Sequence, residues 1–185
     1  MPVGPVVEGN LRKLLFASPD SPEIRETLLR ILDAMEEVPA SDTNSNWLEE
    51  QAVEQLGEFG EPKAQAGLLR AANFDPFASP PDDREKPRIS SCGRVWTVTV
   101  AIKALARIVP DEAIPIIEKY LTPPEVTPNT PHGQWPSEIR FHSVVALGGI
   151  PTERATELLT VATDDVDPVI AKQAREFLES RTSDF

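Results

Sequence analysis

The sequence predicts an all-α protein, a short right-handed α-α superhelix of about four helical hairpins. Residues 138–167 have apolar residues at spacings of three, four and five, interrupted once by Gly-Gly-Ile-Pro at 148–151. This pattern is typical of two amphipathic helices joined by a tight corner. Only 6% of residues are aromatic, while alanine and aliphatic residues are abundant, which favours helices over a β-sandwich. One hairpin cannot bury its own apolar face, so this fold requires copies.

The copies become visible when three hairpins are aligned on Leu56, Leu105 and Leu147, which are about 40–50 residues apart, as in helical repeats. Each anchor leucine has Val or Ile three positions earlier, Gly or Ala one later, Ala eight later and Leu or Ile twelve later. These positions are Val53, Ile102 and Val144; Gly57, Ala106 and Gly148; Ala64, Ala113 and Ala155; Leu68, Ile117 and Leu159. The small residues suit close helix packing.

The N-terminal half begins with a flexible segment over residues 1–9 and a short helix over 10–17. Ser21 is expected to cap the next helix, which has Pro22 at its first position and ends near Met35. A polar loop is predicted over 38–46. The next hairpin combines a helix over 47–59 with one over 63–73, and five prolines around 62–87 predict a long loop over 74–92.

The C-terminal half starts with a helix over 95–109, followed by one over 110–121. The β-branched residues at 95–100 also fit a strand, but the three-four spacing of Val98, Ala101 and Leu105 favours a helix. Prolines predict a loop over 122–136. After the hairpin at 138–167, with Pro151 in the first turn of its second helix, a last helix runs from Pro168 to about Ser180. The repeat domain therefore covers 10–180, and 181–185 is expected to fray.

Charge, cysteine content and hydropathy exclude several classes of protein. The net charge of -12 disfavours nucleic acid and anionic lipid surfaces and favours a basic partner. The single cysteine, Cys92, permits neither an internal disulfide nor a zinc cluster. Without a membrane span or a signal peptide in the sequence, the expected location is the cytoplasm.

The chain resembles the HEAT-like repeat family, particularly the short repeats of phycobilisome lyases. The resemblance rests on Ala52–Gly60, Val144–Gly148 and Asp164–Ala171, with helix starts at Ser21–Arg25 and Ser137–Arg140, and it covers roughly 21–180. It implies stacked hairpins whose second helices line a concave binding surface. The family includes scaffolds, lyase subunits and enzymes, so the resemblance specifies the fold better than the function.

Polar residues of the second helices, together with one loop tryptophan, are the candidate protein-binding residues. They are Arg70, Asn73, Glu118, Lys119, Trp135, Glu157 and Thr160. Trp135 serves either as an interface anchor or as a buried loop residue. Trp47 and Trp96, at equivalent positions of two helices, are predicted to be packing residues. Glu49, Glu50, Glu54 and Glu58 form either a solvated acidic face or a docking strip for a basic partner.

Residues that carry metal or catalytic chemistry elsewhere favour ordinary roles here. His142 and His132 lack a partner at ligand spacing, and neither precedes a glutamate as in the iron-binding relatives. Cys92 is a boundary residue rather than a reactive thiol. Asp164, Asp165 and Asp167 resemble the acids that cap helices in this family. No catalytic residue, cofactor or metal is therefore predicted.

The favoured function is a non-enzymatic protein-binding or scaffold module, because stacked repeats offer an extended curved surface. Two alternatives stay open: a bilin lyase or chaperone-like subunit for a cofactor-bearing protein, and an acidic inhibitor or immunity-type protein that masks a basic enzyme. A DNA-glycosylase-like repeat is disfavoured because that activity needs a basic concave face. The sequence leaves the partner and the oligomeric state open.

Overall fold

The computed structural model describes residues 21–34, 43–74, 91–123 and 135–183, and every regular element within them is a helix. The elements are α2 (Pro22–Ala34), α3 (Thr43–Glu58), the 3-10 helix η1 (Pro62–Ala64), α4 (Gln65–Ala72), α5 (Ser91–Ile108), α6 (Pro110–Leu121), α7 (Ser137–Gly148), α8 (Glu153–Ala162) and α9 (Pro168–Ser183). The predicted all-α class is confirmed. Residues 95–100 belong to α5, so the competing strand interpretation is excluded.

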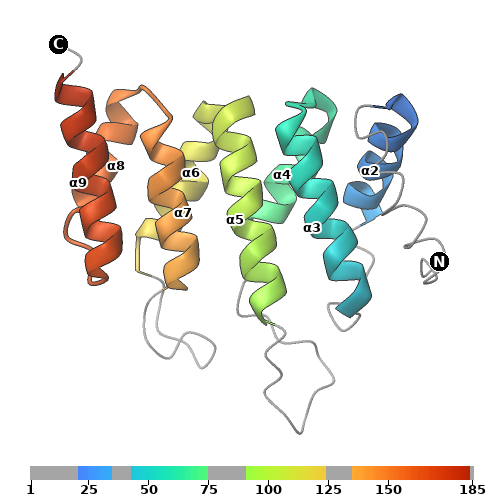
Figure 1. The fold of residues 1–185 in the computed structure, drawn as a ribbon, viewed down its shortest axis with the longest axis horizontal. Helices are drawn as coiled ribbons and strands as arrows, with labels where there is room; N and C mark the ends of the chain where they lie inside the picture. The colour runs from blue at the N-terminus through green and yellow to red at the C-terminus, as the bar shows by residue number, and fades with distance from the viewer. Residues whose placement is uncertain (1–20, 35–42, 75–90, 124–134, 184–185) are drawn as a thin grey trace, which may run out of the picture.

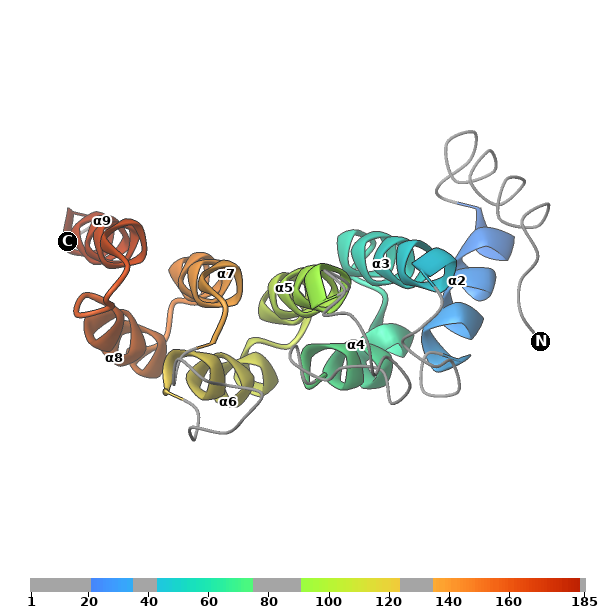
Figure 2. The same cartoon turned by 90° about the horizontal axis from the view of Figure 1, so that it is seen from below.

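The helices form two layers (Figures 1 and 2). The first helices α3, α5, α7 and α9 stand side by side in chain order, and the second helices α4, α6 and α8 lie behind them. Three complete hairpins are described, with α2 packed on α3 at one end and α9 closing the other. The predicted helix over 10–17, which would complete a fourth hairpin, lies outside the described residues. The right hand of the superhelix stays a prediction.

The repeat positions occupy equivalent places in the core. Leu56, Leu105 and Leu147 are completely buried, and so are their counterparts twelve residues later, Leu68, Ile117 and Leu159. The alanines eight positions after each anchor are at most 1% exposed. Each hairpin therefore buries the same set of positions between its own two helices and those of its neighbours, which is how a solenoid builds one continuous core.

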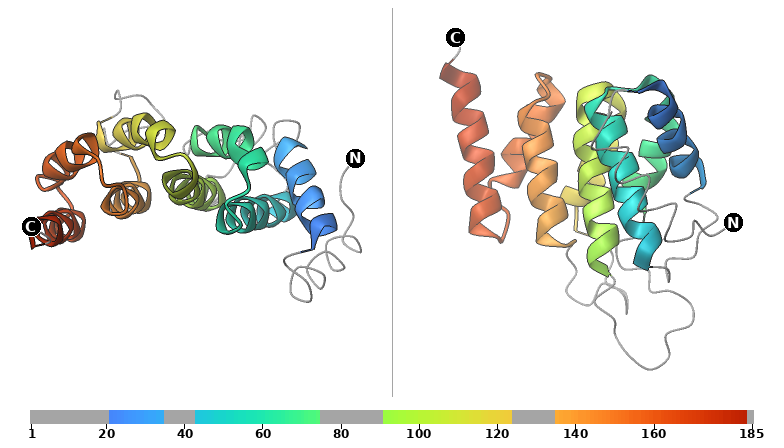
Figure 3. Two further views of the ribbon diagram at one scale, coloured as in Figure 1. Left: turned by 90° about the horizontal axis from the view of Figure 1, so that it is seen from above. Right: turned by 45° about the vertical axis from the view of Figure 1, so that its right-hand side comes forward.

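The first helices pack more closely on one another than the second helices do. A Cβ atom on Gly57 of α3 would lie 2.4 Å from the Cβ of Ala104 on α5, so only glycine permits this approach. Figures 2 and 3 show the row of first helices bowed, with α3 and α9 displaced away from the second layer. The outer surface of the first helices is thus the concave side of the described residues. The resemblance predicted the opposite side, that of the second helices.

Several helix boundaries differ from the predicted ones. α3 and α5 begin at Thr43 and Ser91, about one turn before the predicted starts, because apolar periodicity marks only the turns that pack. Pro151 lies before α8 instead of in its first turn. The hydroxyl oxygen of Thr152 accepts a hydrogen bond from the Ala155 amide and caps α8, so the helix begins at Glu153.

The last helix extends to Ser183, beyond the expected end near Ser180. Arg181 explains the extension. Its guanidinium donates hydrogen bonds to the carbonyl oxygens of Leu147 (2.6 Å) and Ile150 (2.7 Å), and also to the hydroxyl of Thr156. These bonds attach the end of α9 to the corner between α7 and α8, and they add to the turn hydrogen bonds that the same two carbonyls accept from the amides of Ile150 and Thr152.

Candidate functional site

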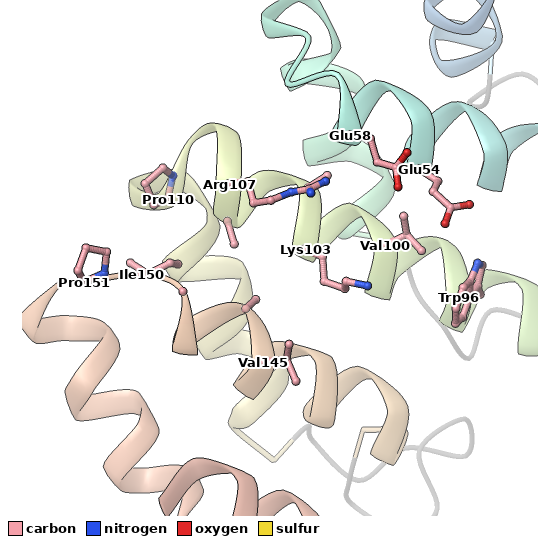
Figure 4. A pocket seen from close by; sticks show the side chains of 14 residues that line it. Glu54, Glu58, Trp96, Val100, Lys103, Arg107, Pro110, Val145, Ile150 and Pro151 are labelled. Carbon is pink, nitrogen blue, oxygen red and sulfur yellow. The ribbon is translucent and has the colours of Figure 1, made fainter. Parts of the chain in front are cut away.

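A groove of about 550 Å³ crosses the outer surface of the first helices α3, α5 and α7. Figure 4 shows that α5 runs along its middle, with α3 on one side and the end of α7 on the other. Its lining residues are Glu54, Glu58, Trp96, Val100, Lys103, Ala104, Ala106, Arg107, Pro110, Val145, Ala146, Gly149, Ile150 and Pro151. The groove therefore lies on the concave side of the described residues.

The midline of the groove is one stripe of α5. Trp96, Val100, Lys103 and Arg107 follow one another at spacings of four, three and four, which places them on one face of a helix. The opposite faces of α5 are filled by buried residues that pack on α3, α4 and α7. Ala104 and Ala146 have short side chains, so the surface sinks between α5 and its neighbours.

Trp96 is the largest side chain at the groove, and it is 46% exposed. Its ring meets the ring of His142 on α7 edge to face, with the centroids 6.4 Å apart. Trp96 was predicted to be a packing residue, but nearly half of its surface is exposed, and that part of the prediction is wrong. Its position nine residues before an anchor leucine points it outward, and an exposed tryptophan on a rigid helix is the residue type most enriched in binding hot spots.

Two cations and two carboxylates line the same groove. Lys103 and Arg107 on α5 are exposed, and no ion pair joins either of them to a residue that the structure describes. Arg107 extends over Gly57 toward α3. On α3, Glu54 accepts a hydrogen bond from Gln51 at 3.1 Å, and Glu58 is exposed. The groove is locally neutral, in a chain whose net charge is -12.

His142 lies at the edge of this site, half-buried between the rings of Trp96 and Phe141. Burial is the main cause that lowers its pKa from the usual 6.5, and the charge of Lys103 lowers it further, against the opposing effect of Glu138. The Nδ1 atom is buried and has no hydrogen-bond partner among the described residues. Burial and the neighbouring ammonium therefore both favour the neutral imidazole of His142.

The predicted binding residues lie elsewhere, on the second helices and near the end of α6. Arg70 of α4 donates to Asp33 of α2 at 3.2 Å, and the Asn73 side chain caps the end of α4 by donating to the carbonyl of Leu69 at 2.9 Å. The Thr160 hydroxyl donates to the Thr156 carbonyl within α8. These contacts hold the three candidate side chains within the chain itself.

Glu118 and Glu157 are joined by one arginine. Arg154 of α8 donates to Glu118 of α6 and to Glu157 of its own helix, each at 2.6 Å. The bonds to these carboxylates, Glu157 first, raise the pKa of the Arg154 guanidinium. The cluster connects two neighbouring second helices at their surface. All three side chains are about half exposed, and such pairs contribute little to stability.

Trp135 closes the end of α6. Its indole N–H donates to the carbonyls of Lys119 and Thr122, at 3.0 Å each, and its ring meets that of Tyr120 with the centroids 5.1 Å apart. The ammonium of Lys119 lies over both rings. A smaller hollow of about 250 Å³ adjoins this cluster. The indole therefore caps helix carbonyls, while its half-buried ring keeps some exposed surface.

One buried ion pair fixes the corner between α8 and α9. Arg140 of α7 donates to both oxygens of Asp165, at 2.9 and 3.0 Å, and also to the carbonyl of Trp135 at 2.7 Å. The two side chains are 9% and 10% exposed. Asp165 also accepts from the Asp167 amide, and Asp167 caps α9 by accepting from the Val169 amide. The predicted capping role is therefore confirmed for Asp167, whereas Asp165 serves mainly as the partner of Arg140.

Sequence reasoning missed the groove residues Lys103, Arg107 and Val145 and misassigned Trp96. The available signal was the α5 stripe itself, an outward tryptophan aligned with two cations on a helix that has a neighbour on each side. The side chains of Trp47, Glu49, Glu50, Cys92 and His132 lie outside the described part of the chain. Among the described residues, no three His, Cys, Asp or Glu side chains come together in a metal-binding arrangement.

No protein-family model matches the chain, and no curated protein matches it either. Within the described residues, none of the helices has both the length and the apolar character needed to cross a membrane.

Proposed function

We propose that the chain is a non-enzymatic protein-binding module of HEAT-like type, and that it binds its partner through the groove across α3, α5 and α7. The observation that carries the proposal is the half-exposed Trp96 at the midline of a preformed groove. Trp96 is held by a helix that packs against neighbours on both sides, so its ring can be buried by a partner without first becoming ordered.

The composition of the groove supports a protein ligand. Val100, Val145, Ile150 and the two prolines give it an apolar lining. Charged side chains lie beside them, with Lys103 and Arg107 on α5 and two glutamates on α3. Protein interfaces commonly combine apolar contacts with charged and polar ones. The net charge of -12 would attract partners with basic surfaces from a distance, which affects the rate of encounter more than the final contacts. A cytoplasmic location completes the proposal.

The test compares the wild-type chain with Trp96→Ala and Val161→Ala. Val161, on α8, is 62% exposed and lies outside the groove, so it controls for general loss of apolar surface. Proteins that co-purify with each form from cells of the source organism are identified, and each candidate is then titrated as a purified protein. We expect a partner whose affinity falls at least about tenfold with Trp96→Ala and is unchanged with Val161→Ala. A partner that binds all three forms equally would refute the groove as the site.

A further inference from the structure

Two cations of the groove differ from nearly all others that the structure describes. The side chains of Arg25, Arg30, Arg70, Lys119, Arg140, Arg154, Lys172, Arg175 and Arg181 each contact an acid, a carbonyl, a hydroxyl or an aromatic ring. Among the Lys and Arg residues whose side chains the structure describes, only Lys63, Lys103 and Arg107 have no such contact. Acids outnumber bases by 30 to 18 in the whole chain, so a cation that forms no ion pair is unusual here, and these two form none although Glu54 and Glu58 line the same groove.

Lys103 and Arg107 are also adjacent. They are one turn apart on α5, so their charges repel each other instead of stabilising the helix. Both continue the stripe that begins with Trp96 and Val100, and Arg107 extends toward α3. Apolar surface and positive charge therefore follow one another along a single line, with Val145 of α7 on one side.

We propose that the occupant of this groove is an amphipathic helix of a partner protein, whose apolar face covers Trp96 and Val145 and whose two acidic residues, three or four positions apart, pair with Lys103 and Arg107. The inference rests on the proposed protein-binding function. The net charge of the chain predicts a basic partner, whereas the groove predicts an acidic segment within that partner. The two differ because the net charge acts over the whole surface, while Lys103 and Arg107 act on groups at contact distance.

The dimensions of the stripe fit a helix of moderate length. Arg107 follows Trp96 by eleven positions, which corresponds to about 16 Å along α5. A partner helix of about three turns spans this distance and can place an apolar anchor at one end and an acidic pair at the other. A free phosphate or a small carboxylate would engage the two cations and leave Trp96 and the apolar lining uncovered.

The experiment is a selection of displayed peptides against the full chain. The library consists of fourteen-residue helices with a fixed leucine stripe and randomised flanking positions, and bound peptides are retained only if Trp96→Ala abolishes their binding. We expect the retained sequences to be enriched in Asp and Glu at two positions one turn apart. The best peptide, made synthetically, should bind at least about tenfold more weakly to the double variant Lys103→Glu, Arg107→Glu.

A matched control removes the ambiguity of overall charge. Lys63 is exposed, forms no ion pair and lies outside the groove. Lys63→Glu changes the net charge by the same amount as one groove substitution and should leave the affinity for the peptide unchanged. Selection against the double variant should return Lys and Arg at the same two positions. Peptides that depend on Trp96 but carry no acidic pair would overturn this inference and leave the proposed function standing. A library that yields no Trp96-dependent peptide would also overturn this inference, and the titration of co-purified partners against Trp96→Ala then decides the proposed function separately.

Discussion

Replacing Asp165 by alanine tests how the last repeat is held together. The substitution removes the partner of Arg140 and leaves a guanidinium that is 9% exposed without its carboxylate. Asp165 accepts three hydrogen bonds, two from Arg140 and one from the Asp167 amide. One change therefore weakens the contact of α7 with the α8–α9 corner and the start of α9.

The expected loss follows from the burial of the pair. Breaking a buried ion pair by removing one partner costs about 3–5 kcal/mol, because the remaining charge stays away from water. The same pair would contribute less than about 1 kcal/mol if it were exposed. For a chain of 185 residues, a loss of 3–5 kcal/mol lowers the melting temperature by about 6–20 °C.

Urea unfolding followed by circular dichroism measures the difference directly. The control is Asp164→Ala, which removes a neighbouring exposed carboxylate with the same change of charge and should alter stability by less than about 0.5 kcal/mol. If the midpoints of Asp165→Ala and Asp164→Ala coincide, the Arg140 pair does not stabilise this corner and the argument from burial is refuted.

Three further outcomes are expected. Burial lowers the pKa of His142 in the folded state, so the unfolded state binds more protons below about pH 6.5 and stability falls as the pH drops. The difference between the unfolding free energies at pH 7 and pH 5.5 should therefore be smaller in His142→Gln than in the wild type. Arg181→Ala removes two bonds to corner carbonyls and should cost about 1–3 kcal/mol in urea unfolding, with faster amide exchange in α9 as the local signature. Gly148→Ala places a Cβ 2.4 Å from the Phe177 ring and should destabilise by about 1–3 kcal/mol, relieved by Phe177→Leu, whereas Gly149→Ala, with its nearest atom at 3.6 Å, should change melting little.

The core was predictable because the same positions are buried in each hairpin. The anchors Leu56, Leu105 and Leu147 are periodic in sequence, and every hairpin solves the same packing problem, so the burial of their equivalents follows from alignment alone. Boundaries were less predictable, since they depend on local capping. Pro151 and Thr152 are both residues that favour the start of a helix. The Thr152 hydroxyl caps α8, so the helix begins at Glu153.

The groove was harder to predict than the core. α5 packs on both sides, so apolar residues cover most of its circumference, and the sequence does not distinguish the exposed Trp96 from buried neighbours such as Val100. Which layer is concave depends on the distance between neighbouring helices. Gly57 sets that distance between α3 and α5 by its contact with Ala104. The sequence pattern predicts a small residue at this position, but it does not predict toward which layer the row of helices curves.

The contact between Gly57 and Ala104 also has an elastic consequence. Because backbone and methyl group already touch there, the array resists any motion that would bend it further inward, while the looser second layer permits it to straighten. We therefore expect flexing of the array to widen the hollow above α5 more readily than to narrow it. The groove would then be unable to close around a bound ligand. The affinity would depend on how well the ligand fits the surface that the groove already presents.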